Sequence, residues 1–362
     1  MKITKIRHLE ISGLNGLERI LKFDFHSDLN LLTGLNGCGK TTILKIIWFV
    51  NCGLIRELLT EVVFSKIELV ADNYSVSIEK KDSSVYQLQW NTKEGDRKQD
   101  IVVDDDNYIS RRDLLDFLDA FYEYGEDSVF FPTFRRIEGG FSMANTTRRY
   151  KTRSTFPLKE ALIDLSDELS SRKHQFIASV STDDITSLLN KEYSSIVRDI
   201  NELQRKQFEE IRKRIVNKEN QLPDVILSEI ESDINTVEQE RNSKLKPFTI
   251  LSDLIMRIFQ KKGIAMEGIV LGDVHNAIAS DKLSAGEKQM LSFLCYNTFS
   301  KEKIIFIDEP ELSLHPDWQR MLISTLLRQG NNNQFFIATH SPFIYTKYSD
   351  KEIIVDSDKG GN

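Results

Sequence analysis

Residues 34–41 read GLNGCGKT, which fits the pattern GxxxxGK followed by Ser or Thr. A short apolar run at residues 29–32 comes before them, and residues 41–49 carry the spacing of a helix. In a strand, glycine-rich loop and helix of this kind, backbone N–H groups and the helix N-terminus surround phosphate oxygens. The stretch therefore predicts a phosphate site formed by Asn36, Gly37, Cys38, Gly39, Lys40, Thr41 and Thr42.

Lys40 and Thr41 have separate predicted roles in this site. A lysine here supplies a point charge to the phosphates, and the hydroxyl one residue later is placed to ligate Mg²⁺. A chance glycine-rich turn is the alternative interpretation, and the flanking strand and helix argue against it. We therefore expect ATP and Mg²⁺ as cofactors.

Residues 304–309 read IIFIDE, an apolar run that ends in two carboxylates. A buried parallel strand would present both at its carboxyl edge, beside the phosphate loop. We expect Asp308 to hold the Mg²⁺ shell and Glu309 to orient and polarise the attacking water, because phosphoryl transfer depends on positioning and charge stabilisation. The alternative is a solvated acidic strand end.

Residues 283–289 read LSAGEKQ and resemble the LSGGQ signature of ABC ATPases. Their position some 20 residues before Asp308 strengthens the resemblance. It implies that a Ser hydroxyl, a Gly amide and a helix N-terminus meet a γ-phosphate bound by the opposite subunit. The residues that would act in trans are Ser284, Ala285, Gly286 and Glu287, of which Ala285 departs from the commonest Gly.

Two further stretches support the same family. Residues 339–342 read THSP and follow an apolar run, where ABC ATPases carry the switch histidine; His340 would hydrogen-bond the γ-phosphate and stabilise developing charge. Residues 310–319 read PELSLHPDWQ and resemble the D-loop of RecF-like and OLD-family ATPases, a dimer contact. The resemblance to the SMC/RecF/OLD-like branch covers residues 1–50 and 265–357.

This resemblance implies an α/β fold of the ABC-ATPase P-loop type. We expect a mixed central sheet, an antiparallel β-subdomain and a helical insertion that can form a short coiled-coil hairpin. The expected division is an N-terminal ATPase lobe at 1–155, the insertion at 156–262, and a C-terminal lobe at 263–362 with the signature, acidic strand end, D-loop and His340. Catalysis is expected from Lys40, Glu309 and His340, in a head-to-tail dimer or a larger assembly.

The pattern along the chain predicts individual elements. Alternation at 61–90 indicates antiparallel strands, 91–107 reads as a polar loop, and 128–131 as a buried strand. Residues 139–155 lack an apolar period and read as a loop, whereas 158–260 read as helical, with Pro223 dividing a hairpin of roughly 30 residues per arm. Residues 269–271 are expected to open the return to the ATPase core.

Composition limits the class of protein. The net charge of -7 argues against broad attraction to nucleic acid, although a local basic patch such as residues 148–153 could contact it. The three cysteines form no CxxC pair, which fits a reducing cytosol. No stretch approaches the roughly 20 apolar residues of a membrane span, and the charged N-terminus is no signal peptide, so we expect a cytoplasmic protein.

Some positions stay open at this level. ABC ATPases carry a Q-loop glutamine that contacts metal and water; Gln87 and Gln89 lie in strand-like sequence, and residues 132–136 are the other candidate. Arg135 and Arg136 could reach a phosphate or a partner, or form surface ion pairs.

The resemblance extends to function. A compact ATPase of this branch with a short helical insertion and no visible nuclease motif looks like the sensor or scaffold subunit of anti-phage systems such as PARIS or Septu, which hold a separate effector such as a nuclease. The alternatives are a RecF-like repair ATPase that clamps DNA, a transporter ATPase, which the insertion and the residues 310–319 disfavour, and a switch that binds ATP with little turnover.

Overall fold

The computed structural model describes residues 4–103, 125–133, 136–137, 157–171, 173–180, 182–217, 223–259 and 283–355. By contacts the chain divides into two compact units. The first contains residues 1–179, 300–324 and 330–362, and the second contains residues 180–299 and 325–329. Residues 139–155, 269–271 and Arg135, for which the sequence made predictions, lie outside the described residues, and only the backbone of Arg136 is described.

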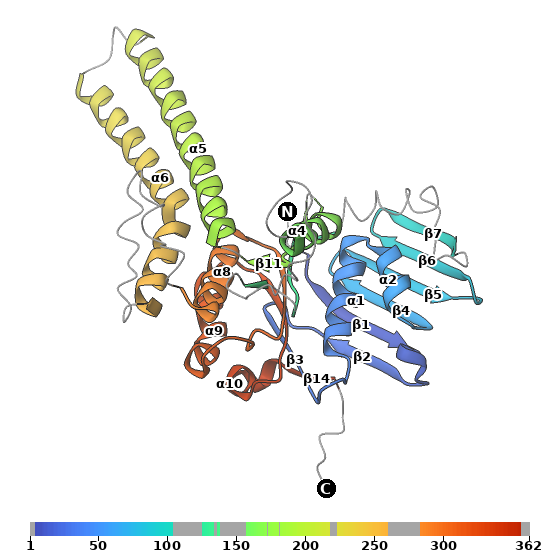
Figure 1. The fold of residues 1–362 in the computed structure, drawn as a ribbon. Helices are drawn as coiled ribbons and strands as arrows, with labels where there is room; N and C mark the ends of the chain where they lie inside the picture. The colour runs from blue at the N-terminus through green and yellow to red at the C-terminus, as the bar shows by residue number, and fades with distance from the viewer. Residues whose placement is uncertain are drawn as a thin grey trace, which may run out of the picture. The chain divides into compact units, whose positions relative to one another are not determined.

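The first unit contains a six-stranded sheet in the order β10-β8-β12-β13-β3-β14, in which all neighbours are parallel (Figure 1). Its central strands are buried throughout, as expected for mostly apolar strands in a parallel sheet. The strands are β3 (Leu29–Thr33), β8 (Ser128–Phe131), β10 (His174–Phe176), β12 (Ile304–Asp308), β13 (Gln334–Ala338) and β14 (Glu352–Ile354).

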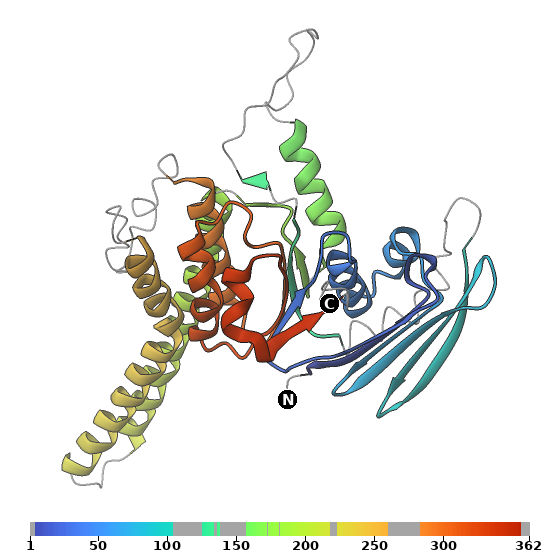
Figure 2. The same ribbon diagram turned by 90° about the horizontal axis from the view of Figure 1, so that it is seen from below.

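A second sheet of the same unit is antiparallel, in the order β2-β1-β4-β5-β6-β7. Figure 2 shows it as a curved layer formed by the blue and cyan strands. The strands are β1 (Ile6–Ser12), β2 (Ile20–Asp24), β4 (Lys66–Ala71), β5 (Tyr74–Lys80), β6 (Val85–Thr92) and β7 (Gly95–Val102). The α/β fold class is confirmed, with the parallel and antiparallel strands sorted into separate sheets.

The predicted loop at residues 91–107 is wrong over its described part, because β7 (Gly95–Val102) pairs with β6. This strand lies at the edge of the antiparallel sheet, and Ile101 is its only buried side chain. An edge strand with polar residues on both faces lacks the apolar alternation by which strands are recognised.

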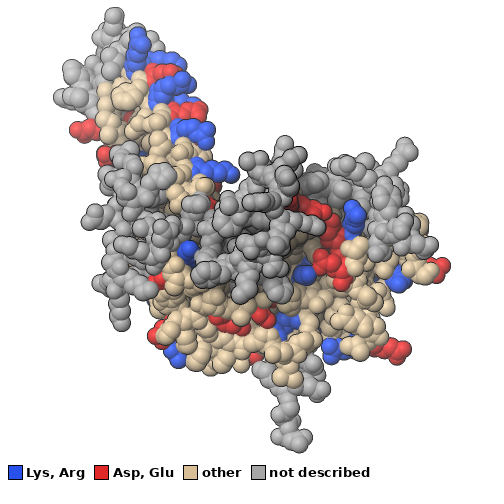
Figure 3. Space-filling view, viewed as in Figure 1, with Lys and Arg blue, Asp and Glu red and all other residues tan. Residues whose placement is uncertain are grey.

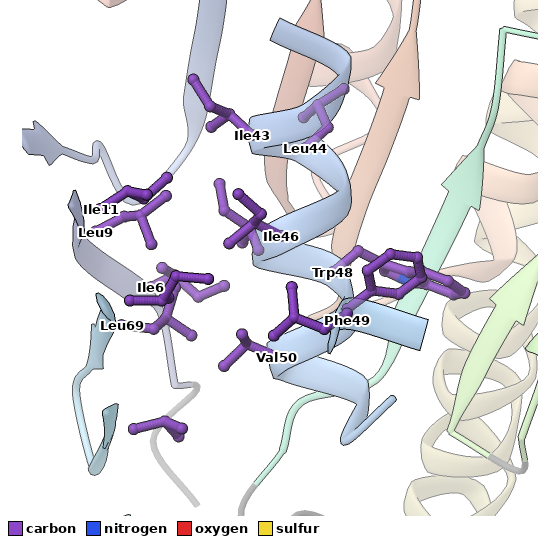
Figure 4. Packing of buried hydrophobic residues seen from close by; sticks show 14 of the residues in the cluster. Ile6, Leu9, Ile11, Ile43, Leu44, Ile46, Trp48, Phe49, Val50 and Leu69 are labelled. Carbon is purple, nitrogen blue, oxygen red and sulfur yellow. The ribbon is translucent and has the colours of Figure 1, made fainter. Parts of the chain in front are cut away.

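Helix α1 (Lys40–Cys52) packs between the two sheets of the first unit. Ten of its thirteen residues are buried, so it is apolar around most of its circumference, as a helix covered on all sides must be. Figure 4 shows Ile43 and Ile46 of α1 facing Ile11 and Leu9 of β1. The helix that follows the phosphate loop is therefore fixed on both sides.

Gln334 joins the two sheets by hydrogen bonds from a fully buried side chain. Its Oε1 accepts the backbone N–H of Ile6 at 2.9 Å, and its Nε2 donates to the carbonyl oxygens of Ile6 and His26, both at 2.8 Å. A buried amide with all these bonds made stabilises one relative placement of β13 and β1.

His174, in β10, is a buried titratable group close to α1. Its Nδ1 lies 2.9 Å from Ser128 Oγ, which also accepts the indole N–H of Trp48 at 3.2 Å. Ser128 Oγ therefore links the Trp48 indole and the His174 ring in the buried layer beside α1. Burial, with smaller contributions from Lys173 and Lys303, lowers the pKa of His174 to about 4.

This lowered pKa predicts a loss of stability in acid. The unfolded chain takes up a proton near pH 6.5 and the folded chain only near pH 4, so stability falls as the pH drops through that window. Between pH 7 and pH 5 the free energy of unfolding should fall by about 2 kcal/mol more in the wild type than in His174→Asn, as measured by urea denaturation. Equal pH dependence of the two proteins would contradict this.

The prediction of helix over 158–260 is wrong at β10, which is a strand of the parallel sheet in the first unit. The second unit contains the predicted helical hairpin. Its arms, α5 (Thr182–Asn217) and α6 (Pro223–Phe259), have 36 and 37 residues, longer than expected, and α6 begins at Pro223. Contacts between the arms run antiparallel: Tyr193 meets Phe248, and Lys244 reaches Asp199 at 3.4 Å. Along the face in view, Figure 3 shows Lys and Arg alternating with Asp and Glu on the hairpin, as on a solvated helix.

The base of the hairpin packs against α8 (Ala285–Phe299), the helix that carries the signature-like stretch. Phe248 of α6 is 2% exposed and its ring lies 4.9 Å from that of Phe299. For this reason α8 belongs to the same compact unit as the hairpin. Of the chain that the structure describes, no helix is both long enough and apolar enough to cross a membrane.

The remaining elements are short, apart from two amphipathic helices. They are η1 (Leu14–Gly16), α2 (Ile55–Glu61), β9 (Arg136–Ile137), α4 (Pro157–Leu169), β11 (Ser179–Val180), α9 (Pro316–Arg328), α10 (Pro342–Tyr345) and η4 (Thr346–Lys351).

Candidate functional site

The loop between β3 and α1 has a backbone that glycine favours. Gly37 and Gly39 have φ angles of 79° and 99°, in the region that side chains rarely adopt. A Cβ added at either position would meet no atom within 4 Å, so the backbone conformation, and not crowding, requires glycine. Asn36 and Gly37 are exposed, so the outer side of the loop is open to a ligand.

Lys40 opens α1 and is 4% exposed. Its ammonium donates to the carbonyl oxygens of Gly34 and Leu35, at 3.2 and 2.9 Å, and lies 3.3 Å from His340 Nδ1. These contacts hold the charge inside the curve of the loop. A buried cation in this position suits an anionic group bound to the loop.

Asp308 ends β12 and is 1% exposed. Its two carboxylate oxygens each lie 3.0 Å from Thr41 Oγ1, and Thr133 Oγ1 also donates to the carboxylate. One carboxylate and two hydroxyls therefore meet at the carboxyl edge of the parallel sheet. Hard oxygen donors of this kind suit Mg²⁺ bound through one carboxylate, a hydroxyl and waters.

Glu309 follows Asp308 but differs from it in exposure, since 27% of its side chain is accessible. Its φ angle is 47°, a left-handed conformation that costs of order 1 kcal/mol in a non-glycine residue. Its backbone N–H still bonds the carbonyl of Ala338 at 2.9 Å. The side chain of Glu309 is therefore partly accessible, whereas the side chain of Asp308 is buried.

His340 lies between Lys40 and Glu309. Its Nδ1 faces the Lys40 ammonium, and its Nε2 lies 3.6 Å from Glu309 Oε1. Because an ammonium can only donate, the contact assigns Nδ1 as acceptor and places the ring proton on Nε2, toward the Glu309 carboxylate. The structure thus gathers Lys40, Thr41, Asp308, Glu309 and His340 at one edge of the parallel sheet.

These residues fit the triphosphate and Mg²⁺ expected from the sequence. The open glycine loop with the buried Lys40 supplies the donors and charge that phosphates require, and Thr41 with Asp308 supplies the oxygen ligands. Residues 1–345 match the protein family described as AAA ATPase domain. The chain belongs to this family.

Curated proteins with similarity to this AAA ATPase domain match it over short stretches. Endonuclease GajA of Bacillus cereus is 36% identical over 75 residues, 19% of this chain and 13% of GajA. The retron Vc95 probable ATPase of Vibrio cholerae is 31% identical over 84 residues, 20% of this chain and 16% of that protein. The chain therefore spans only about a seventh of the length of these relatives.

Among solved structures, the chain is similar to the Smc head domain of Pyrococcus furiosus with an extended coiled coil, bound to the C-terminal domain of ScpA. The TM-score is 0.40 at 14% identity, over 95% of this chain and 92% of the Smc chain.

The signature-like residues of this AAA ATPase domain lie in its second unit, where they begin α8. Ser284 and Glu287 form a capping box: the Ser284 backbone N–H and hydroxyl donate to Glu287 Oε2 at 2.6 and 2.8 Å. Glu287 is 1% exposed, and Gly286 is also buried. The capping box fixes the Ser284 hydroxyl at the helix N-terminus, the end that attracts anions.

Sequence reasoning missed some residues of the site. Thr133 lay in the range considered for the Q-loop, but its contact with Asp308 was not expected; Gln87 and Gln89 lie in β6, where they bond Asp100 and Asn91. A signal existed, because residues 132–133 follow the buried strand β8, and residues after neighbouring parallel strands meet at one edge. The sequence could not show that β8 and β12 are neighbours.

Proposed function

We propose that this protein binds ATP with Mg²⁺ and hydrolyses it in a head-to-tail dimer. The gathering of Lys40, Thr41, Asp308, Glu309 and His340 at one sheet edge carries this proposal. Membership of the AAA ATPase domain family supports it. Each residue type has a role in phosphoryl transfer, which needs charge stabilisation and an aligned nucleophile.

In this mechanism Lys40 and the loop amides orient the β- and γ-phosphates. Thr41 and Asp308 would hold Mg²⁺, which when bound would supply positive charge to the phosphate oxygens. Glu309, with its partly exposed carboxylate, orients the attacking water and accepts its proton. His340 donates from Nε2 toward the developing negative charge, and Thr133 keeps the Asp308 carboxylate in place.

Two observations support the proposed dimer, namely the signature-like residues and the exposed apolar side chains near the site. Leu35 in the phosphate loop and Leu312 in the loop after Glu309 are 57% and 45% exposed. A second copy that brings its Ser284 hydroxyl and α8 N-terminus to the γ-phosphate would cover such side chains. We propose that ATP joins the two copies and that hydrolysis releases them.

A mixing experiment tests the dimer directly. Lys40→Met disables the phosphate loop and Ser284→Arg disables the signature, so each protein alone should be inactive. In a mixture, half of the dimers combine both variants, and each of these has one intact site, so activity should return to about a quarter of the wild-type value. A mixture that stays inactive, although co-purification of differently tagged variants shows mixed dimers with ATP, would contradict sites shared between two copies.

We further propose that the ATPase is the sensor or scaffold subunit of an anti-phage system and controls a separate effector such as a nuclease. Similarity to endonuclease GajA and to retron-named probable ATPases supports this role. The test is the plating efficiency of a phage panel on cells that express the native operon with wild type or Glu309→Gln. Protection by the wild type is expected, and equal plating on cells lacking the gene would exclude the role.

A further inference from the structure

Glu311 is a carboxylate of the loop 309–315 whose two oxygens are both used on the segment that carries His340. Glu311 Oε1 accepts the backbone N–H of His340 at 2.6 Å, and Oε2 accepts the Thr339 hydroxyl at 2.8 Å. Thr339 is fully buried, and its hydroxyl also accepts the backbone N–H of Ser341 at 3.0 Å. Bonds to an ionised acceptor are shorter and stronger than neutral ones, so this carboxylate fixes the backbone at His340.

A second side chain ties the same two segments together. Gln319 of α9 donates from Nε2 to the carbonyl oxygens of Leu314 and Glu311, at 2.8 and 3.3 Å. Its Oε1 accepts the Ser341 hydroxyl at 2.5 Å. The loop 309–315 and the segment 339–341 are therefore joined on both sides of His340.

The loop 309–315 is itself a tight, strained turn. Glu309 and Ser313 have φ angles of 47° and 71°, and the backbone N–H groups of Leu312 and Leu314 bond back to the carbonyls of Glu309 and Glu311. Leu312 and Ser313 at its tip are exposed. Because Glu309 and Glu311 belong to this hydrogen-bonded turn, a displacement of its tip would also displace both residues.

We infer that Glu311 is a positioning residue that couples the tip of this loop, Leu312 and Ser313, to the imidazole of His340. Glu311 does not touch the reacting atoms; it holds the backbone from which His340 reaches Lys40 and Glu309. A second copy that contacts Leu312 would set the position of His340 through this carboxylate. The inference rests on the proposed function, because it assumes that His340 acts in ATP hydrolysis.

The first test is kinetic and uses the full chain. Glu311→Ala should lower kcat for ATP hydrolysis by about 10- to 100-fold, with KM changed much less, because a displaced group near the reacting atoms slows chemistry more than it weakens binding. Glu311→Gln keeps one acceptor and should recover part of the rate. Glu57→Ala, on α2, is the control and should behave as wild type, and melting temperatures check that each variant is folded.

A double-mutant cycle separates coupling from general structural damage. If Glu311 acts through His340, Glu311→Ala should cost little further rate in a His340→Ala background, measured by single turnover. If Glu311→Ala lowers the single-turnover rate by the same factor in the wild type and in His340→Ala, the inference is wrong. An inactive wild type would instead contradict the proposed function.

An NMR experiment tests the coupling without any activity. In protein labelled with ¹⁵N-histidine, the His340 ring signals are assigned by their loss in His340→Gln. Glu311→Ala should shift the His340 Nδ1 and Nε2 signals, and Glu57→Ala should leave them in place. Unchanged His340 signals in a folded Glu311→Ala protein would overturn the inference, whatever the rates.

Discussion

Glu309→Gln should reduce ATP hydrolysis by about 10²-fold or more while ATP still binds. The amide keeps the size of the side chain and its place at the turn, where φ is 47°, but it cannot accept the proton of the attacking water. Binding should persist because Lys40, Thr41 and Asp308 are unchanged. The measurement is steady-state phosphate release, together with the Kd for a fluorescent ATP analogue.

The matched control is Glu57→Gln, the same chemical change in α2, which should leave turnover at the wild-type value. A second expectation follows if hydrolysis releases the dimer: Glu309→Gln should remain a dimer in ATP, whereas wild type returns to monomer as ATP is consumed. Wild-type turnover by Glu309→Gln would show that another group accepts the proton, and the role assigned to this carboxylate would be wrong.

The parts of the site that sequence could predict are those set by local chain order. Lys40 and Thr41 follow a glycine loop between a buried strand and a helix, and Asp308 and Glu309 end another buried strand. Parallel strands place such ends at one edge, so their meeting could be expected before the structure. His340 was selected by its place after β13, and in the structure it lies beside Lys40 and Glu309.

Contacts that depend on strand order could not be predicted in the same way. Thr133 meets Asp308 only because β8 is the neighbour of β12, although about 175 residues separate them in sequence. Glu311 clamps Thr339 and His340 because β12 and β13 are adjacent. Both residues lie in stretches that the sequence had marked, at 132–136 and 310–319, but the sequence did not show which atoms they contact.

Two elements were predicted wrongly or with the wrong length because their sequence pattern is weak. The edge strand β7 has polar side chains on both faces and was predicted as a loop, since nothing buries its outer side. The hairpin was predicted because its apolar residues recur at helical spacing. Its length was underestimated because the arms continue past their buried base into exposed, charged turns, with Phe208 72% exposed.

Lys40→Met should raise the Kd for ATP by about a hundredfold or more, because a buried charge-assisted contact is lost. Methionine keeps the length of the buried stem but removes the ammonium that binds Gly34 O and Leu35 O and faces His340. Hydrolysis should fall together with ATP binding. In Glu309→Gln, by contrast, hydrolysis should fall while ATP binding persists. The measurement is isothermal titration with ATP and Mg²⁺.

Lys45→Met, five residues further along α1, is the matched control for this change. Lys45 is half-exposed and pairs with Glu61 at 2.7 Å, an ion pair worth about 0–1 kcal/mol, so neither ATP binding nor folding should change much. Lys40→Met should also remain folded, because removing a buried ammonium removes its desolvation cost as well as its bonds. If Lys40→Met bound ATP as tightly as Lys45→Met, the phosphates would have to bind away from residues 34–41, and the remaining site assignments, which are built around that loop, would fail with it.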